Sequence, residues 1–295
     1  MYRSRMPGVV VLNPAAGPEP TEEPDVALHF AGHDIVECEP AELPARVQDA
    51  VDAGARFVAV GGGDGTIRAA AQVLAGTGVP LLPIPAGTRN HFARAVGIED
   101  LEDAGRAATE GVVRRVDLGE VNGQRFVNNS SIGIYPRIVV TREAHERRWP
   151  KGVATVAAVW EQLRHGRRFR VSVDGRPYRA WMVFVGNGRY GRGLLRLNSR
   201  EALDDDVLDF RLARADSPLA RARVLAALVA GGIDRSPLLV RRVTGQIEVG
   251  LDRATVEVAL DGEVHTLRPP LRYVSRPGAL AVLVPPEAGE KMAER

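Results

Sequence analysis

The stretch that decides the fold is Val58-Ala-Val-Gly-Gly-Gly-Asp-Gly-Thr66, which is followed by Ile67-Arg-Ala-Ala-Ala71. An apolar run, a glycine turn and a second apolar run at helical spacing predict a strand, a tight turn and a helix. Glycines let the backbone approach a phosphate, and the free N–H groups of the following helix bind anions. Asp64 lies in the middle of this turn, where its carboxylate would repel an anion, so its presence requires an explanation.

The same alternation of strands and helices extends along the first hundred residues. We expect strands near residues 9–12, 35–38, 57–60 and 79–84, and helices near 43–51, 67–74 and 91–96. This order is typical of a mostly parallel sheet with helices on both faces. The first part of the chain is therefore predicted to be an α/β domain.

After about residue 125 the pattern changes to strands that follow one another. Strand candidates lie at residues 168–173, 178–185, 207–212, 246–251, 255–260 and 264–267, with helices near 152–164 and 218–231. Asp174-Gly175 is a typical hairpin signal. We therefore predict a second, mainly antiparallel β domain at residues 125–275. The α/β domain would cover residues 1–124, and residues 276–295 would return to it.

Composition restricts the possible partners. The chain has 295 residues, 45% of them apolar, and a net charge of only +2, so we expect no nucleic-acid partner. A single cysteine, Cys38, allows no internal disulfide. No run approaches the roughly 18 apolar residues of a membrane-spanning helix, and the run at residues 9–12 is too short for a signal peptide. We expect a cytoplasmic protein, and nothing in the composition indicates its oligomeric state.

Three turns follow predicted strands, at residues 13–17, 61–66 and 85–90. In an open parallel sheet, ligands bind outside the carboxyl ends of the strands. None of the three turns matches the G-x-x-x-x-G-K-[ST] or G-x-G-x-x-G pattern. Spacing alone therefore leaves two interpretations open, a phosphate site and a turn that only serves packing.

Asp64 favours the phosphate site if a cation lies between the carboxylate and the phosphate. Mg²⁺ is commonly held by one or two carboxylates together with phosphate oxygens and water. We therefore predict that Asp64 recruits a divalent metal. The alternative is that Asp64 is a general base toward an attacking hydroxyl group.

At these motifs the chain resembles a known family. Gly62-Gly-Asp-Gly-Thr66 resembles the GGDGT signature of diacylglycerol kinases, sphingosine kinases, bacterial lipid kinases and NAD kinases. Pro85-Ala-Gly-Thr-Arg-Asn90 with His91-Phe-Ala-Arg94 resembles the G-T-x-N-D-x-A-R motif of the bacterial diacylglycerol kinase branch. Asn13-Pro-Ala-Ala-Gly17 resembles its N-P-x-x-G nucleotide loop, and residues 126–133 and 185–188 are also similar to family segments.

The resemblance covers nearly the whole chain and implies a nucleotide-binding α/β domain, a β-sandwich domain and an active site in the cleft between them. It also implies ATP and Mg²⁺ as cofactors, with Asp64 in the metal network. The residues expected to line the nucleotide are Asn13, Gly62, Gly63, Gly65, Thr66, Gly87, Thr88 and Asn90.

Two motifs of the second domain carry the remaining roles. Leu203-Asp-Asp-Asp-Val-Leu-Asp209 resembles the family's L-D-D-G-x-L-D, in which Asp205 matches the carboxylate that binds a structural magnesium. Asp261-Gly-Glu263 resembles its D-G-E. The resemblance makes Asp261 the general base and places Glu263 in the magnesium network through water. Without it, Asp261-Gly262 is a plain hairpin turn.

Three positions depart from the family's pattern. Pro18 replaces a basic residue, His91 replaces the aspartate of G-T-x-N-D, and Asp206 replaces the glycine of D-D-G. His91 could hold a turn or meet phosphate. These departures bear on substrate and rate more than on fold.

A basic cluster with an aromatic side chain lies in the second domain. Its members are Arg142, Arg147, Arg148, Trp149 and Lys151. The cluster is either a solvated loop or a contact with a membrane surface, because Trp and Arg suit an interface with anionic lipid. The second interpretation would place the protein peripherally at the inner membrane face.

The sequence therefore predicts an ATP- and Mg²⁺-dependent lipid kinase that transfers the γ-phosphate to a hydroxyl group of diacylglycerol or a similar lipid at a membrane surface. Such an enzyme would belong to phospholipid biosynthesis. Two alternatives stay open: a soluble kinase such as NAD kinase, and a nucleotide- or lipid-binding protein without catalysis.

Overall fold

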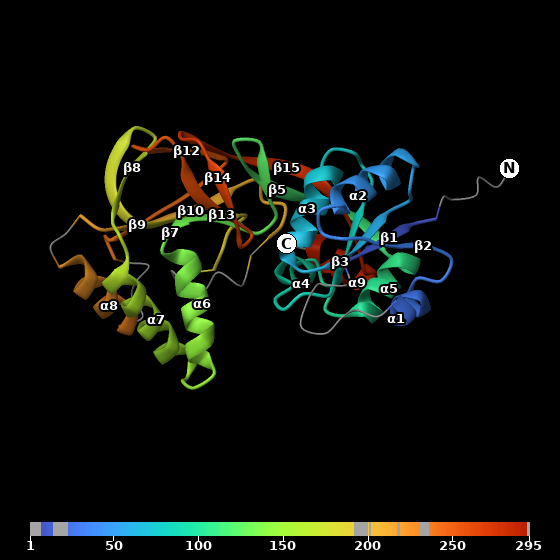
Figure 1. The fold of residues 1–295 in the computed structure, drawn as a ribbon, viewed down its shortest axis with the longest axis horizontal. Coiled ribbons are helices and arrows are strands. Elements are labelled where there is room, and N and C mark those ends of the chain that lie inside the picture. Colours follow the sequence, from blue (N-terminus) through green and yellow to red (C-terminus); the bar gives the residue numbers. More distant parts are fainter. Residues whose placement is uncertain are drawn as a thin grey trace.

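The computed structural model describes residues 7–13, 23–191, 200, 202–216, 219–230 and 236–293. One continuous sheet path runs through these residues, in the order β14-β13-β7-β9-β8-β12-β15-β4-β3-β1-β2. Its two ends differ in character: parallel strands form one end and antiparallel strands form the other (Figure 1). This mixed α/β arrangement confirms the predicted fold class.

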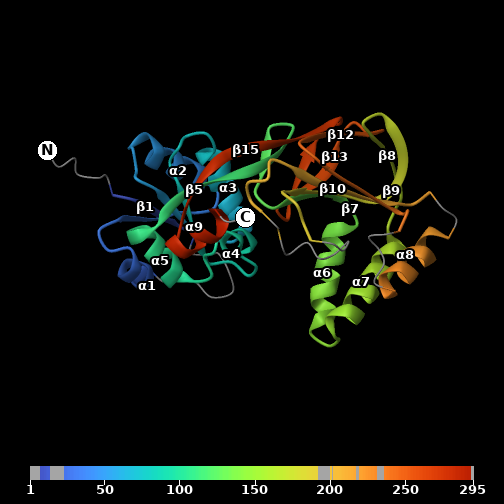
Figure 2. The ribbon, with the colours of Figure 1, turned by 180° about the vertical axis from the view of Figure 1, so that it is seen from behind.

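The N-terminal half is a parallel sheet covered by helices on both faces. Its strands are β1 (Val9–Leu12), β2 (Asp34–Glu37), β3 (Val58–Gly62) and β4 (Leu81–Pro85). Its helices are α1 (Glu23–His29), α2 (Leu43–Asp52), α3 (Asp64–Leu74), α4 (His91–Ala95), α5 (Leu101–Glu110) and α9 (Pro286–Ala293). Helices α2 and α3 lie on one face, and α1 and α5 lie on the other (Figures 1 and 2).

The opening stretch folds as its pattern predicts. All residues of β3 are buried, as expected for a strand that is covered on both faces. Helix α3 turns Ile67, Ala70, Ala71 and Leu74 toward the same core. The glycine turn between β3 and α3 therefore lies at the carboxyl edge of the sheet, where open parallel sheets bind their ligands.

The C-terminal half is built from antiparallel pairs. Its strands are β5 (Val112–Val121), β6 (Gln124–Phe126), β7 (Asn129–Gly133), β8 (Phe169–Val173), β9 (Arg176–Asn187), β10 (Leu208–Arg214), β11 (Leu239–Thr244), β12 (Gln246–Leu251), β13 (Val256–Leu260), β14 (Glu263–Leu267) and β15 (Leu271–Val284). A second core, rich in Val and Leu with Phe126 and Tyr273, fills their inner faces.

Strand β15 joins the two halves. At its start it pairs with β12 in the antiparallel half, and at Val282 it pairs in parallel with Leu81 of β4. From Tyr273 to Val284 it also runs antiparallel to β5. The domain boundaries at residues 124/125 and 275/276 stay a prediction.

Three helices form a separate layer on the antiparallel half. They are α6 (Tyr135–Glu146), α7 (Lys151–His165) and α8 (Ala220–Val229). They project from one side of the sheet in both views (Figures 1 and 2), and a third core cluster packs them against Trp181, Phe184 and Tyr190. Helices α7 and α8 match predicted segments, but α6 was missed because its apolar residues follow no clear helical period. Pro136 lies in its first turn, where proline is tolerated.

None of the helices in the described ranges is long and apolar enough to cross a membrane.

Gly133 gives a stability prediction, because it directs the chain from β7 into α6. Its φ is +90°, and a Cβ atom there would overlap the backbone carbonyl oxygen of Trp181. Gly133→Ala should therefore lower the free energy of unfolding by about 1–3 kcal/mol. Chemical denaturation measures this change.

Gly152→Ala is the matched control. Gly152 lies near the start of α7, and an added Cβ there would have no heavy atom within 4 Å. This substitution should leave stability unchanged or raise it by up to about 1 kcal/mol. Equal losses for the two variants would contradict the account of the β7–α6 junction.

Candidate active site

The second and third turns lie against each other. Strands β3 and β4 are parallel neighbours, so their carboxyl ends share one edge. A Cβ atom on Gly87 would collide with the backbone of Gly63, so glycine is required where the turns touch. Asn90, with φ +50°, closes the third turn: its side-chain amide accepts from the Gly87 N–H (2.8 Å) and donates to the Gly87 carbonyl (2.7 Å).

The predicted nucleotide residues gather at this edge. Asn13 is buried, and its N–H donates to the carbonyl of Gly61 at 3.2 Å. Residues 14–17 of the first turn and Pro18 lie outside the described residues. The expected nucleotide-lining residues near Asn13 are Gly62, Gly63, Gly65, Thr66, Gly87, Thr88 and Asn90, all within or just after the turns that follow β3 and β4. Their contact with a nucleotide stays a prediction.

Asp64 is the first residue of α3 and faces the start of α4. Its carboxylate accepts hydrogen bonds from the backbone N–H groups of His91 (3.2 Å) and Phe92 (3.0 Å) and from the side-chain amide of Asn128 (3.2 Å). The first N–H groups of a helix have no partner within it, so Asp64 supplies one. A carboxylate has about four lone-pair sites; the three bonds therefore leave acceptor capacity for a cation.

Asp261 lies in the turn between β13 and β14, with φ +49°. Its carboxylate accepts from three successive backbone N–H groups, those of Val127 (2.8 Å), Asn128 (2.7 Å) and Asn129 (2.9 Å). Burial and, to a smaller extent, the charge of Asp64 raise the pKa of Asp261 to about 6 against the lowering effect of these bonds. A carboxylate that titrates near neutral pH can take a proton at physiological pH.

Asn128 connects the two carboxylates. Its side-chain amide donates to Asp64 and its backbone N–H donates to Asp261. Its side-chain oxygen accepts from Arg200 (2.7 Å), and its carbonyl accepts from the hydroxyl of Tyr190 (2.8 Å). No role was predicted for Asn128 from the sequence, although it lies in the family-like segment at residues 126–133 and begins the polar run Asn128-Asn-Ser-Ser131.

A cavity of about 350 Å³ lies beside these residues. Asp64, Asp261 and Asn128 contribute to its wall, together with residues of α4 and α6. Its other lining residues include the aliphatic Ile138, Val139 and Val140, the cations Arg94 and Arg142, and Thr88 and His91. Burial lowers the pKa of His91, so its imidazole is neutral near pH 7. The cavity therefore combines two carboxylates with an aliphatic strip on α6.

Glu263 lies beside the second turn, at residues 61–66, but contacts a protein cation. Its carboxylate forms an ion pair with Arg68 of α3. A Cβ atom on Gly65 would overlap that carboxylate, so the glycine at this position is explained by Glu263 packing across the two halves. The predicted place of Glu263 in a magnesium network stays a prediction.

The carboxylate of Asp205 has an oxygen atom that could bind a cation. Its Oδ2 accepts from the N–H of Arg189 at 3.0 Å, whereas its Oδ1 is buried without a hydrogen-bond partner. A Cβ atom on Gly188 would lie 2.9 Å from the carbonyl oxygen of Ala202 and 3.3 Å from Asp205 Oδ1, so these two oxygens lie on the same side of Gly188. Mg²⁺ accepts such carboxylate and carbonyl oxygens along with water. In the described part of the chain, no three His, Cys, Asp or Glu side chains cluster to hold a metal.

The neighbouring departure, Asp206, has a conformational explanation. Its φ is +59°, a region in which glycine is favoured and aspartate is tolerated. Its backbone N–H donates to Asp117 at 2.7 Å. The family's glycine is therefore replaced without loss of the turn.

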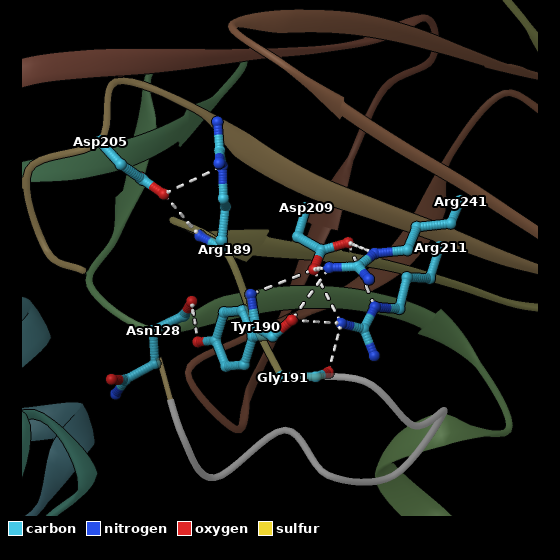
Figure 3. A network of polar contacts seen from close by, with 8 residues as sticks. All are labelled: Asn128, Arg189, Tyr190, Gly191, Asp205, Asp209, Arg211 and Arg241. Carbon is cyan, nitrogen blue, oxygen red and sulfur yellow. Dashed lines mark hydrogen bonds and ion pairs between the residues drawn. The ribbon is translucent and has the colours of Figure 1, made fainter. Parts of the chain in front are cut away.

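A buried network of charged side chains holds the backbone of Tyr190 (Figure 3). Asp209 is fully buried and accepts from Arg211 (2.7 Å), Arg241 (2.7 Å) and the N–H of Tyr190 (3.1 Å). Both guanidinium groups also donate to the carbonyl of Tyr190. Burial alone would raise the pKa of Asp209, but the bonds from the two arginines hold it below its usual value. The network fixes the backbone of Tyr190, whose hydroxyl reaches Asn128.

Two family models match the chain. The diacylglycerol kinase catalytic domain matches residues 7–121. The YegS C-terminal NAD kinase beta sandwich-like domain matches residues 135–284. Together they extend over both halves of the sheet.

Curated relatives match over most of their length. A protein of Pseudomonas aeruginosa PAO1 is 31% identical over 286 residues, covering 94% of this chain and 93% of the relative. A protein of Pseudomonas fluorescens Pf-5 is 30% identical over 272 residues, covering 89% of each. Both are named "Probable lipid kinase YegS-like".

Solved structures share the fold. A structure described as a diacylglycerol kinase from Bacillus anthracis str. Sterne superposes with a TM-score of 0.68 at 20% identity. The superposition covers 97% of this chain and 100% of that one.

The network around Asp209 gives a second stability prediction. Asp209→Ala would remove the carboxylate that Arg211 and Arg241 share and leave the Arg211 guanidinium buried without its ion pair to Asp209, so it should lower the free energy of unfolding by about 3–5 kcal/mol. Chemical denaturation measures the loss, and the control is Glu248→Ala. Glu248 pairs with Arg272 at the surface (3.0 Å), and exposed pairs contribute about 0–1 kcal/mol. A loss below 1 kcal/mol for Asp209→Ala would contradict the supporting role of the network.

Proposed function

The chain belongs to the diacylglycerol kinase catalytic-domain family and is a kinase of its lipid-kinase branch, and we propose that it transfers the γ-phosphate of ATP, with Mg²⁺, to a hydroxyl group of diacylglycerol or a similar lipid. The observation that carries this proposal is the joint placement of Asp64 and Asp261. They come from different halves of the chain, share Asn128 and line one cavity.

The glycine turns supply the nucleotide side of the proposal. The turns after β3 and β4 present backbone N–H groups at one sheet edge, as phosphate sites at strand ends do. Mg²⁺, when bound, neutralises charge on the β- and γ-phosphate oxygens. Asp64 and, at the second site, Asp205 are the side chains whose free acceptor capacity fits such an ion.

Asp261 supplies the acid–base chemistry. Its carboxylate would accept the proton of the acceptor hydroxyl while that oxygen forms a bond to the γ-phosphorus, and the bond from the γ-phosphorus to the bridging oxygen of ADP breaks. Three backbone N–H groups hold the carboxylate in one orientation. Orientation matters because proton transfer requires hydrogen-bond contact with the reacting oxygen.

The cavity wall supports a lipid acceptor. Ile138, Val139 and Val140 place aliphatic side chains along the α6 side of the cavity. Burying an acyl chain against such a surface is favourable because apolar area is removed from water. The polar dinucleotide NAD would bury little apolar area there. We propose further that the reaction takes place on the cytoplasmic side of a membrane, where ATP is available, and that it belongs to phospholipid biosynthesis.

The direct test is phosphate transfer from γ-labelled ATP, with Mg²⁺, to a panel of diacylglycerol, other hydroxylated lipids and NAD. We expect labelled lipid and no labelled NAD. Transfer to NAD alone would replace the proposal with a soluble-kinase function. Calorimetric binding of ATP without transfer to any acceptor would replace it with a binding function.

Asp261→Asn gives the sharpest mutational prediction. It should lower kcat about 10²- to 10⁴-fold, because the amide cannot take the proton. Asp174→Asn is the matched control: Asp174 also precedes glycine in a hairpin turn, with φ +46°, but its carboxylate pairs with Arg242 outside the cavity. Steady-state kinetics should show the control within about twofold of wild type. Similar rates for Asp261→Asn and wild type would remove Asp261 from the chemistry.

The pH dependence follows from the pKa of Asp261. Because that pKa is raised to about 6, the carboxylate is protonated below about pH 6 and cannot accept a proton. We expect log(kcat/KM) for the lipid acceptor to fall with unit slope below this pH and to level off above it. A flat profile between pH 5 and pH 8 would show that another group takes the proton.

A further inference from the structure

The outer side of α7 is apolar although it faces solvent. Val153 and Trp160 are exposed, Trp160 to 45%, and Val156 and Ala157 between them are half-buried. Their spacing places the four side chains on one stripe of the helix. Other residues of α7, among them Ala158, Val159 and Leu163, are buried and pack in the third core cluster. An amphipathic helix normally buries its apolar side, so the outer stripe has no partner within the described chain.

Helix α8 repeats this arrangement next to α7. Leu219, directly before the helix, and Val229 at its end are 68% and 73% exposed. Ala222 and Ala226 are exposed at the same helical spacing. Val224, on the other side, is buried in the core. Because α7 and α8 pack side by side (Figures 1 and 2), the layer carries exposed apolar stripes on two neighbouring helices.

The turn between α6 and α7 combines an exposed aromatic ring with cations. Trp149 is 45% exposed and stacks on the ring of His145, with 5.0 Å between centroids. Arg147, Arg148 and Lys151 surround it and are exposed. Tryptophan with flanking basic residues is typical of segments that sit at the membrane–water interface. The basic cluster therefore lies at the exposed tip of the α6–α7 hairpin, and its contact with a membrane surface stays a prediction beside the alternative of a solvated loop.

Charge is concentrated in the same layer. Residues 135–170 contain nine arginines and lysines but three glutamates, whereas the whole chain has a net charge of only +2. The rest of the chain is accordingly net acidic. A basic, partly apolar face is complementary to an anionic lipid surface. Two copies of the face would repel each other, which disfavours a symmetric dimer through it.

The face is continuous with the cavity. Helix α6 lines the cavity from Tyr135 to Glu146, about 17 Å at 1.5 Å per residue. Glu146 is three residues from Trp149, and the aliphatic strip of α6 lies between the hairpin tip and Asp261. One helix therefore connects the apolar face with the two carboxylates.

We propose that the outer face of the α6–α7 hairpin and α8, which we call the docking face, binds the surface of an anionic lipid bilayer. Trp149, Trp160, Leu219 and Val229 would enter the headgroup region, and Arg147, Arg148 and Lys151 would contact the anionic headgroups. A single lipid molecule would then pass along α6 to Asp261. This last step rests on the proposed lipid kinase function, whereas binding to the bilayer does not.

Co-sedimentation with vesicles tests the docking face. Vesicles of neutral phosphatidylcholine are compared with vesicles that also contain anionic phosphatidylglycerol. We expect the wild type to bind the anionic vesicles, more weakly as salt is raised. Trp149→Ala with Trp160→Ala, and separately Arg147→Glu with Arg148→Glu, should weaken binding at least about tenfold.

Matched controls lie on other surfaces. Leu28 is an exposed apolar residue of α1, and Arg268 is exposed after β14; Leu28→Ala and Arg268→Glu should bind vesicles like the wild type. Docking variants that bind as tightly as wild type, or equal binding of neutral and anionic vesicles, would overturn the proposal. Sedimentation equilibrium showing a dimer that Trp160→Ala disrupts would also overturn it and make the face an interface between copies.

Activity measurements separate this proposal from the proposed function. Phosphorylation of a water-soluble, short-chain diacylglycerol should be unchanged in the docking variants, because Trp149 and Trp160 lie outside the cavity wall. Phosphorylation of long-chain diacylglycerol in anionic vesicles should fall with vesicle binding. Normal vesicle binding without phosphorylation of either substrate would refute the lipid kinase function and leave the docking face supported.

Discussion

The hydrogen bonds of Asn128 are the constraint on which the site depends. The residue stands just before β7 in the antiparallel half, yet its side chain holds Asp64 of the parallel half and its backbone holds Asp261. The two carboxylates are therefore fixed relative to each other only when the halves are correctly joined. The buried network of Asp209 also helps to position Asn128. It fixes the backbone of Tyr190, whose hydroxyl donates to the carbonyl of Asn128.

Several polar residues near the glycine turns have two roles. They hold the two halves of the chain together, and they lie at the proposed phosphate site. Asp64 satisfies the first N–H groups of α4, and Arg68 pairs with Glu263 across the halves. Gly65 leaves room for that glutamate. A substitution at any of these positions would disturb both the relative placement of the halves and the proposed phosphate site, so loss of activity alone does not assign a role. Controls in matched turns, away from the cavity, make that distinction.

Local patterns predicted much of the fold, because the strands β1, β3 and β4 are apolar runs that end in glycine or proline turns. Helix α6 was not predictable in the same way, since its side chains serve the core, the cavity and solvent and therefore lack one apolar stripe. The sequence motifs indicated Asp64 and Asp261 separately. Their common contact, Asn128, depends on pairing between distant segments, which no local spacing reveals.

The central claim is that the glycine turns hold the nucleotide and direct its terminal phosphate toward Asp64 and Asp261. A crystal structure with Mg²⁺ and a non-hydrolysable ATP analogue tests this most directly. The account predicts that the phosphates lie on the turns at residues 61–66 and 85–88, with the γ-phosphate in the cavity that Asp261 lines. A nucleotide bound on another surface, or a γ-phosphate directed away from Asp261, would contradict it.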